Sequence, residues 1–145
     1  MRPERSVLEG RYVMQLIDAN VFLEIELKQE RVDRCKAYLR RVRDGEISSI
    51  TTNFIVDTVC VLMDEAECDP AQIRTFNLSL LKYKGLSIYD LTLEDRIVAT
   101  DRMRQFKLDF DDAAAYAAMT ATGASEIVSM DRHFDKIPDI KRIEP

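Results

Sequence analysis

The chain has 145 residues, of which 46% are hydrophobic and 32% charged, a composition typical of one globular domain. Its formal net charge of −5 excludes a generally basic surface for binding nucleic acid. An enzyme that binds cations through clustered acids can nevertheless be acidic overall and have basic residues around its active site. The three cysteines form no Cys-x-x-Cys pair and His133 is the only histidine, which argues against a disulfide frame, a structural zinc site and any multi-histidine metal site. We expect reduced thiols in a cytoplasmic protein, with no signal peptide and no membrane span.

The first predicted element is a short buried strand over residues 13–17. Residues 1–12 are polar and predict a flexible or additional lead-in to a single domain over residues 13–145. The apolar run ends on Asp18, and Asn20 follows two residues later. Because ligands bind at the carboxyl ends of strands in an open α/β sheet, Asp18 could hold a metal ion with Asn20 beside it. The alternative is that one of these side chains only caps the helix that follows.

Helices and strands alternate along the rest of the chain. One helix, ending at about Glu65, is apolar nearly all round, so we expect it to be largely buried. Asp57 and Thr58 interrupt it, and polar groups in a buried helix need partners, which makes this a second candidate position for a functional carboxylate. The predicted elements are helices over residues 21–25 and 29–43, a strand over 47–50, a helix from a cap at Thr51 or Thr52 to about Glu65, a helix over 70–84, a strand over 86–91, a helix over 92–107 that opens with a Thr92–Asp95 capping box, an alanine-rich helix ended by Gly123, and strands over 126–130 and 140–143.

Acidic residues mark two further candidate positions. Three acids crowd the start of the alanine-rich helix, although one acid would satisfy the helix dipole at about 0.3–1 kcal/mol. The strand after this helix ends on Asp131, and Phe134 is expected to close the following loop as part of the core. The three crowded acids are Asp109, Asp111 and Asp112.

The alternation of strands and helices predicts an α/β fold, a three-layer α/β/α sandwich with a central, mostly parallel sheet of four to five strands. In this arrangement Asp18 and Asp131 end different strands at the same edge, and Asp112 begins a helix that can point at that edge. Converging carboxylates repel each other unless cations neutralise them. All-oxygen ligation favours Mg²⁺ or Mn²⁺ over zinc. A pair of such ions about 3.5–4 Å apart is a standard means of hydrolysing phosphodiesters.

With these residues in this order, the sequence resembles the PIN-domain nucleases, in particular the small prokaryotic members that include the toxins of VapBC toxin–antitoxin systems. The resemblance covers nearly the whole chain from about Met14. The family's opening motif matches residues 17–22, its acid before an alanine-rich helix matches Asp112-Ala113, and its final strand-Ser/Thr-x-Asp-x-x-Phe segment matches residues 128–134. The resemblance implies a nuclease that cleaves RNA internally with Mg²⁺ or Mn²⁺, with a small antitoxin as partner and a homodimer as its state.

One position departs from the family's pattern. The family usually has Glu in the helix after the second strand, and a gapless match places Thr58 there, with Asp57 as its neighbour. Either Asp57 supplies the missing carboxylate through a rotated helix, since adjacent helical residues differ by about 100°, or the site lacks one ligand. The alternative function is therefore a catalytically weakened PIN-like module that binds RNA or protein. A phosphatase or receiver-like domain would need a lysine after a late strand, and none follows there.

The resemblance implies a catalytic set of four acids, of which three hold metal, together with polar side chains that support them. Ser129 is expected to bond a ligand carboxylate or water, and Asp135 is either a surface acid or a supporting group. His133 is expected to be a loop residue rather than a general base. The catalytic acids are Asp18, Asp57, Asp112 and Asp131; the metal ligands are Asp18, Asp112 and Asp131; the supporting residues are Asn20, Thr58, Ser129 and Asp135. Asp109 and Asp111 are expected to be caps rather than extra ligands. Candidates to hold the RNA backbone, each otherwise a solvated surface charge, are Arg40, Arg41, Arg43, Arg102, Arg104, Lys107, Arg132 and Lys136.

Overall fold

The computed structural model describes residues 13–145, so the predicted lead-in over residues 1–12 lies outside the described residues. Within them, five parallel strands form one sheet in the order β3-β2-β1-β4-β5. β1 lies in the middle, where Gln15 pairs with Ser49 on one side and with Glu126 on the other. The strands are β1 (Gln15–Ile17), β2 (Ser49–Thr52), β3 (Leu86–Tyr89), β4 (Glu126–Val128) and β5 (Lys141–Ile143).

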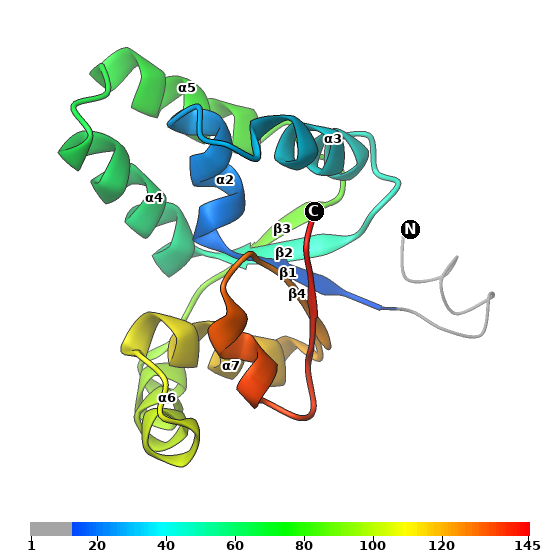
Figure 1. The fold of residues 1–145 in the computed structure, drawn as a ribbon, viewed down its shortest axis with the longest axis vertical. Helices are drawn as coiled ribbons and strands as arrows, with labels where there is room; N and C mark the ends of the chain where they lie inside the picture. Colours follow the sequence, from blue (N-terminus) through cyan, green and yellow to red (C-terminus); the bar gives the residue numbers. More distant parts are fainter. Residues whose placement is uncertain (1–12) are drawn as a thin grey trace.

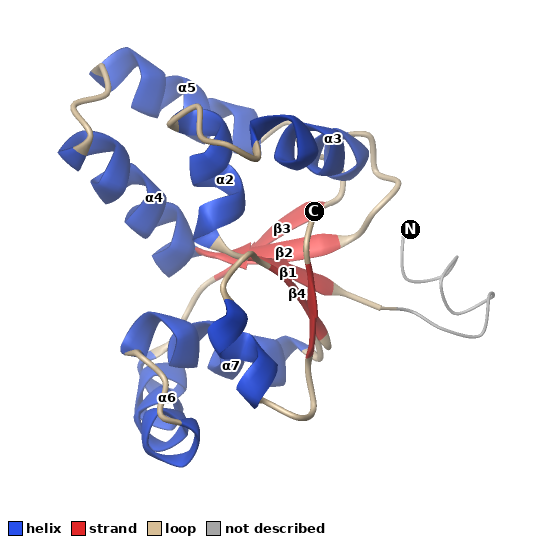
Figure 2. Cartoon of the chain, in the orientation of Figure 1, coloured by secondary structure: helices blue, strands red, loops and turns tan. Residues whose placement is uncertain are grey.

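Helices cover both faces of this sheet (Figure 1). Four of those in the described chain lie on one face and two on the other, so Figure 2 shows helix, strand and helix in successive layers. The first face carries α2 (Ala19–Glu26), α3 (Val32–Arg43), α4 (Asn53–Glu65) and α5 (Pro70–Leu80). The second face carries α6 (Leu93–Phe106) and α7 (Phe110–Thr122), and a 3-10 helix, η1 (Arg132–Lys136), joins β4 to β5. The predicted α/β fold is confirmed.

The core lies where the inner strands meet α7. Leu16 and Ile17 of β1 and the facing Ile127 and Val128 of β4 are fully buried. The alanines at positions 113–115, 117 and 118 of α7 are buried too, because small side chains let this helix approach the sheet closely. Phe134 of η1 is also buried, which confirms its predicted place in the core. This packing holds the ends of β1 and β4 beside the start of α7.

The prediction that the helix ending at Glu65 would be largely buried is wrong. α4 buries the stripe Ile55, Val59 and Met63, whereas Val61 is 55% exposed and Leu62 is 37% exposed. The helix packs against α2 and α5. When a helix is apolar on all sides, its sequence does not indicate which side is covered by other elements. A prediction from the sequence alone therefore overestimates how much of the helix is buried.

Several predicted boundaries are confirmed by cap geometry, and others shift. Thr52 caps α4 by accepting a hydrogen bond from Ile55 N, and Gly123 ends α7 with a left-handed φ of 82°. β2 begins at Ser49, two residues later than predicted, and α5 ends at Leu80 rather than Lys84. Among the described residues, no helix is long and apolar enough to cross a membrane. The cysteines at 35, 60 and 68 are all free thiols.

Candidate active site

Asp18 lies directly after β1 and has two structural roles at once. Its Oδ1 accepts a hydrogen bond from Ala19 N at 2.9 Å, so the predicted alternative of a helix cap is present. Its Oδ2 accepts from Ser129 Oγ at 2.7 Å and from Asn20 Nδ2 at 3.3 Å. Capping occupies only one oxygen of the carboxylate, and the other oxygen joins a polar network at the edge of the sheet.

Ser129 is the centre of that network. Its buried hydroxyl donates to Asp18 and accepts hydrogen bonds from Asp131 N at 2.9 Å and from Asn20 Nδ2 at 3.1 Å. Asn20 Oδ1 in turn accepts a hydrogen bond from Met130 N at 3.4 Å. The hydroxyl thereby uses its single donor and both of its acceptor positions. The expected bond from Ser129 to a carboxylate of the site is present, and it ties the end of β1 to the end of β4.

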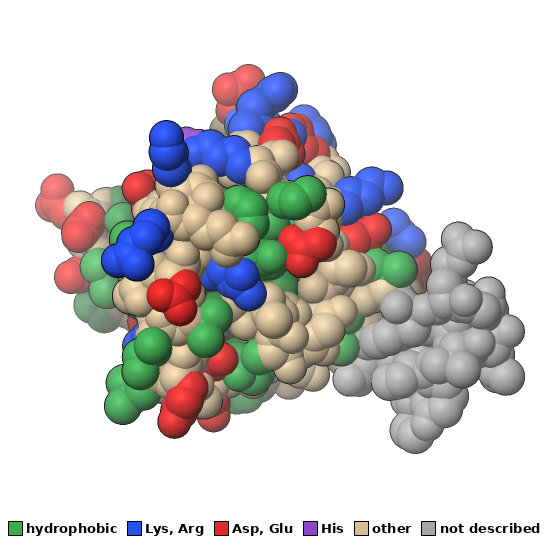
Figure 3. Space-filling view, turned by 90° about the horizontal axis from the view of Figure 1, so that it is seen from below, with side chains coloured by type: hydrophobic (Ala, Val, Ile, Leu, Met, Phe, Trp, Pro, Cys, Tyr) green, Lys and Arg blue, Asp and Glu red, His purple; other side chains and the backbone are tan. Residues whose placement is uncertain are grey.

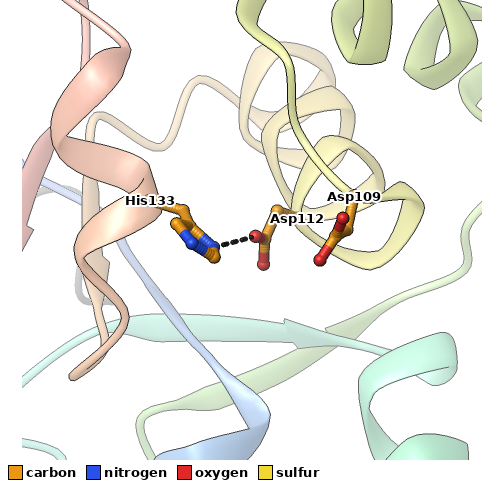
Figure 4. A group of neighbouring side chains, drawn as sticks. All are labelled: Asp109, Asp112 and His133. Atoms are coloured by element: carbon orange, nitrogen blue, oxygen red, sulfur yellow. Dashed lines mark hydrogen bonds and ion pairs between the residues drawn. The ribbon is translucent and has the colours of Figure 1, made fainter.

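Asp112 and Asp131 meet at the imidazole of His133. Asp112 stands in the first turn of α7 and is buried, and its Oδ2 lies 3.3 Å from His133 Nδ1 (Figure 4). The same ring nitrogen lies 3.2 Å from Asp131 Oδ1, which also accepts a hydrogen bond from His133 N at 2.9 Å. The expectation that His133 would be only a loop residue missed this contact. The signal available was its position two residues after Asp131, within reach of that carboxylate.

The carboxylates of the site perturb one another. Burial raises the pKa of Asp18 to about 6, and the charges of Asp131 and Asp111 add to this against the hydrogen bonds from Ser129 and Ala19. Burial likewise raises the pKa of Asp112 to about 7, with further increases from Asp131, Asp111 and Asp18 that outweigh its bond to His133. Asp131 raises the pKa of both Asp18 and Asp112, and Asp18 raises the pKa of Asp112, so the three predicted carboxylates lie close together. Such mutual repulsion is typical of functional carboxylate clusters.

Asp109 and Asp111, the other acids at the start of α7, differ in the hydrogen bonds of their carboxylates. Asp111 Oδ1 accepts a hydrogen bond from Asp112 N at 2.9 Å, which is a local bond at the helix start, as expected. Asp109 occupies the N-cap position, but its carboxylate makes no capping bond. The expectation of a cap is therefore right for the position of Asp109 and wrong for its side chain. Asp109, Asp112 and His133 each offer one ligand atom, and these atoms lie within 4.8 Å of one another.

The structure brings neither Asp57 nor Thr58 into this network through a hydrogen bond. Asp57 is exposed, and its carboxylate has no hydrogen bond or ion pair within residues 13–145. Thr58 Oγ1 donates to Phe54 O at 2.9 Å, and the Phe54 ring packs edge-on against Phe110 at the start of α7. Residues four apart share one face of a helix, so Thr58 lies on the same face of α4 as Phe54, and Asp57 points about 100° away. A role for Asp57 as the fourth carboxylate stays a prediction.

Asp135 acts on the site only through another residue. Its carboxylate is exposed and forms an ion pair with Arg142 at 2.9 Å. Arg142 Nη1 also donates to Ser129 O at 3.2 Å. Asp135 therefore orients an arginine that holds the backbone beside the central serine.

Basic residues are divided between two regions. Arg40 and Arg43 line a hollow with Ile25, at the end of α2 opposite to Asp18. By contrast, Lys136 Nζ donates to Lys107 O at 3.2 Å, so two lysines meet close in sequence to Asp109. In the view from below, basic, acidic and apolar side chains are interspersed without a broad basic field (Figure 3).

Comparisons with known proteins agree with this architecture. A family model for the PIN domain matches residues 16–140. No curated protein matches the chain by sequence. Similar solved structures include Mycobacterium tuberculosis VapC20, described as a sarcin-ricin loop cleaving toxin, with a TM-score of 0.73 at 15% identity over 90% of this chain and 99% of that one.

Two solved toxin–antitoxin structures are also similar. VapBC2 from Rickettsia felis, bound to a DNA fragment from its promoter, has a TM-score of 0.70 at 12% identity over 92% of this chain and 99% of that one. VapBC-1 from nontypeable Haemophilus influenzae has a TM-score of 0.66 at 11% identity over 91% and 98%. At such low identities the likeness to these structures shows a shared fold.

Proposed function

The chain belongs to the PIN domain family, a family of nucleases, and on this premise we propose that it is a metal-dependent endoribonuclease that hydrolyses RNA phosphodiesters. The observation that carries the proposal is the convergence of Asp18, Asp112 and Asp131 from the ends of β1 and β4 and the start of α7. Burial raises the pKa of Asp18 to about 6 and that of Asp112 to about 7, and neighbouring carboxylates raise both further, so a bound cation would stabilise the ionised form of the cluster.

The donor set fits a divalent cation. The buried carboxylate of Asp112 has only His133 as a hydrogen-bond partner among the described residues, which leaves its other oxygen available. Asp18, Asp112 and Asp131 would hold Mg²⁺ or Mn²⁺, both of which prefer carboxylate oxygens. Such ions, when bound, lower the pKa of an attacking water and stabilise the charge that develops on the phosphate.

The surrounding side chains position these acids in advance. Ser129 and Asn20 bond one oxygen of Asp18, and Ala19 N bonds the other, so the carboxylate has one orientation before any substrate arrives. Because the Asp18 side chain is already ordered, less conformational entropy is lost at the site when substrate binds. Lys107 and Lys136 are the basic side chains that we assign to the RNA backbone near the site.

One observation favours a second candidate function, a catalytically weakened PIN-like module that binds RNA or protein. A gapless match to the family's pattern places Thr58 where Glu is usual, and the Thr58 hydroxyl is bonded to Phe54 O rather than to a carboxylate of the site. Asp57, its acidic neighbour, is exposed. The two functions differ in whether the bound RNA is cut.

The test is cleavage of a mixed RNA pool with Mn²⁺ or with EDTA, using the Asp18→Asn variant as the inactive form. Asparagine caps helices as well as aspartate does, so this change removes the charge and keeps the α2 cap. We expect the native protein to cut RNA only with metal and the variant to lose at least about 100-fold in rate, as for loss of a group that stabilises the transition state.

The matched control is Asp64→Asn, an exposed acid on α4, which should cut at the native rate. Cleavage that persists in Asp18→Asn would point to a contaminating nuclease and contradict the proposal. RNA that is bound but not cut would favour the weakened module.

We further propose that the protein is the toxin of a toxin–antitoxin pair, with a small antitoxin as partner, and that it is a cytoplasmic homodimer. The similar structures of VapBC-1 and VapBC2 support the pairing by analogy of fold. Large apolar side chains such as Leu81 at 81% exposure and Leu93 at 73% exposure would gain from being covered by another chain. Sedimentation equilibrium would show the homodimer as twice the chain mass of 16.7 kDa.

A further inference from the structure

A second group of donor atoms adjoins the three proposed metal ligands, and it contains nitrogen. We propose that Asp109, Asp112 and His133 form a cation position of mixed nitrogen and oxygen donors, which shares Asp112 with the Asp18–Asp131 cluster and binds Mn²⁺ in preference to Mg²⁺. The inference rests on the proposed metal dependence and specifies which ion the site takes.

The geometry of the group suits one ion. One ligand atom from each residue lies within 4.8 Å of the others, and the three side chains converge in Figure 4. Ligand atoms at about 2.1 Å from an ion are about 3 Å apart when adjacent and about 4.2 Å apart when opposite. The 3.3 Å between His133 Nδ1 and Asp112 Oδ2 is already close to the spacing of adjacent ligands. A small rotation of the exposed Asp109 side chain would complete the set.

Asp109 has a carboxylate that its own helix does not use. It stands at the N-cap of α7, where an aspartate normally accepts a backbone hydrogen bond, yet its side chain accepts none. Nor does that carboxylate form a hydrogen bond or ion pair with any other described residue. The side chain therefore has no structural task that competes with ligation.

The ring of His133 is held where a ligand is needed. Its backbone N–H donates to Asp131 Oδ1, and the next residue, Phe134, is anchored in the core. The ring thus has its Nδ1 directed at Asp112 and Asp131 rather than at solvent. In the tautomer that carries its proton on Nε2, Nδ1 offers a lone pair to a cation.

The mixed donor set determines which ion is preferred. Mg²⁺ favours oxygen donors and keeps several waters, whereas imidazole favours transition-metal ions. Mn²⁺ accepts carboxylate and imidazole together, so it suits Asp109, Asp112 and His133 better than Mg²⁺ does.

The test is electron spin echo envelope modulation of Mn²⁺ bound to the full chain, prepared without a histidine tag. Because the chain contains a single histidine, modulation from an imidazole nitrogen can come only from His133. We expect this signal in the native protein and in Asp109→Asn, and we expect its loss in His133→Gln. Calorimetry should show Mn²⁺ affinity lower by about 10–100-fold in His133→Gln, with Mg²⁺ affinity changed by less than about threefold.

Asp64→Asn on α4 is the matched control and should keep both the signal and the affinity. Mn²⁺ that binds the native chain without nitrogen modulation, and equally well in His133→Gln, would overturn this inference and leave the proposed nuclease intact. A native chain that binds no Mn²⁺ at all would overturn both. The nitrogen modulation of Mn²⁺ bound to the native protein tests ligation by His133 even where His133→Gln fails to fold.

Discussion

At the scale of single residues, the acids of the site oppose folding when metal is absent. Burial raises the pKa of the Asp112 carboxyl from its ordinary value of 3.8 to about 7. Between these two pH values the unfolded chain has lost this proton while the folded chain keeps it. The contribution of Asp112 to stability is therefore complete below about pH 4 and is lost as the pH rises through 7. Asp18 behaves in the same way over a narrower range, up to about pH 6.

Replacing Asp112 with asparagine should stabilise the metal-free protein at high pH. In EDTA at pH 8, we expect Asp112→Asn to raise the free energy of unfolding by about 1–3 kcal/mol, because the variant buries no charge. For a domain of this size, that is an increase in melting temperature of about 2–4 °C for each kcal/mol. Thermal melts at pH 4 and pH 8 check it, since the gain should nearly vanish at pH 4. A variant less stable than the native chain at pH 8 would contradict the pKa assignment.

At the scale of elements, α6 shows how local sequence sets a helix end. Thr92 Oγ1 accepts a hydrogen bond from Asp95 N at 3.0 Å, and Asp95 Oδ2 accepts from Thr92 N at 2.9 Å, which confirms the predicted capping box. Tyr89 at the end of β3 also donates to Asp95 Oδ2, at 2.7 Å. The tyrosine bond was not apparent from the sequence, and it joins the box to the edge of the sheet.

Removing the capping threonine should weaken the fold and spare the site. We expect Thr92→Ala to lower the free energy of unfolding by about 0.5–2 kcal/mol through loss of the cap. Thr75→Ala is a matched control, because this exposed threonine bonds Ala71 O within α5 and caps nothing. Urea unfolding of both variants measures the difference, while Mn²⁺ affinity should stay at the native value. Equal stabilities for the two variants would show that the box does not hold the start of α6.

At the scale of the whole molecule, an acidic protein is proposed to bind a polyanion. The net charge of −5 opposes RNA at long range, so binding must rest on local cations near the cluster. Lys107 and Lys136 meet beside the start of α7, whereas Arg40 and Arg43 lie at the far end of α2. Of the eight basic candidates that the sequence left equal, the structure thus places these two lysines near the cluster and these two arginines away from it.

A double variant of the two lysines should weaken RNA binding in a salt-dependent way. We expect Lys107→Gln with Lys136→Gln, in an Asp18→Asn background that prevents cleavage, to reduce the slope of log affinity against log salt by about 0.7 for each phosphate that a lysine no longer neutralises. The charge-matched control is Lys36→Gln with Lys82→Gln, two exposed lysines on α3 and after α5. Fluorescence anisotropy at several salt concentrations measures both slopes. A smaller slope in the control than in the test variant would place the RNA elsewhere.

The sequence by itself predicted the alternation of strands and helices, the Thr92–Asp95 capping box and the proximity of Asp18, Asp112 and Asp131. These features depend on local chemistry: apolar runs that end on acids, side chains that bond the first turn of a helix, and alanines that allow close packing. For that reason the α/β fold and the meeting of the three carboxylates at one sheet edge could be predicted.

Only the tertiary structure decided which side of α4 is covered, where the ring of His133 lies and that the Asp109 carboxylate is not used as a cap. The covered side of α4 depends on how α2 and α5 pack against it. The contact between His133 and Asp112 joins residues 21 positions apart, which meet only when η1 and the start of α7 are both packed on the sheet. Contacts of this kind depend on the relative placement of whole elements, and local residue patterns carry no record of that placement.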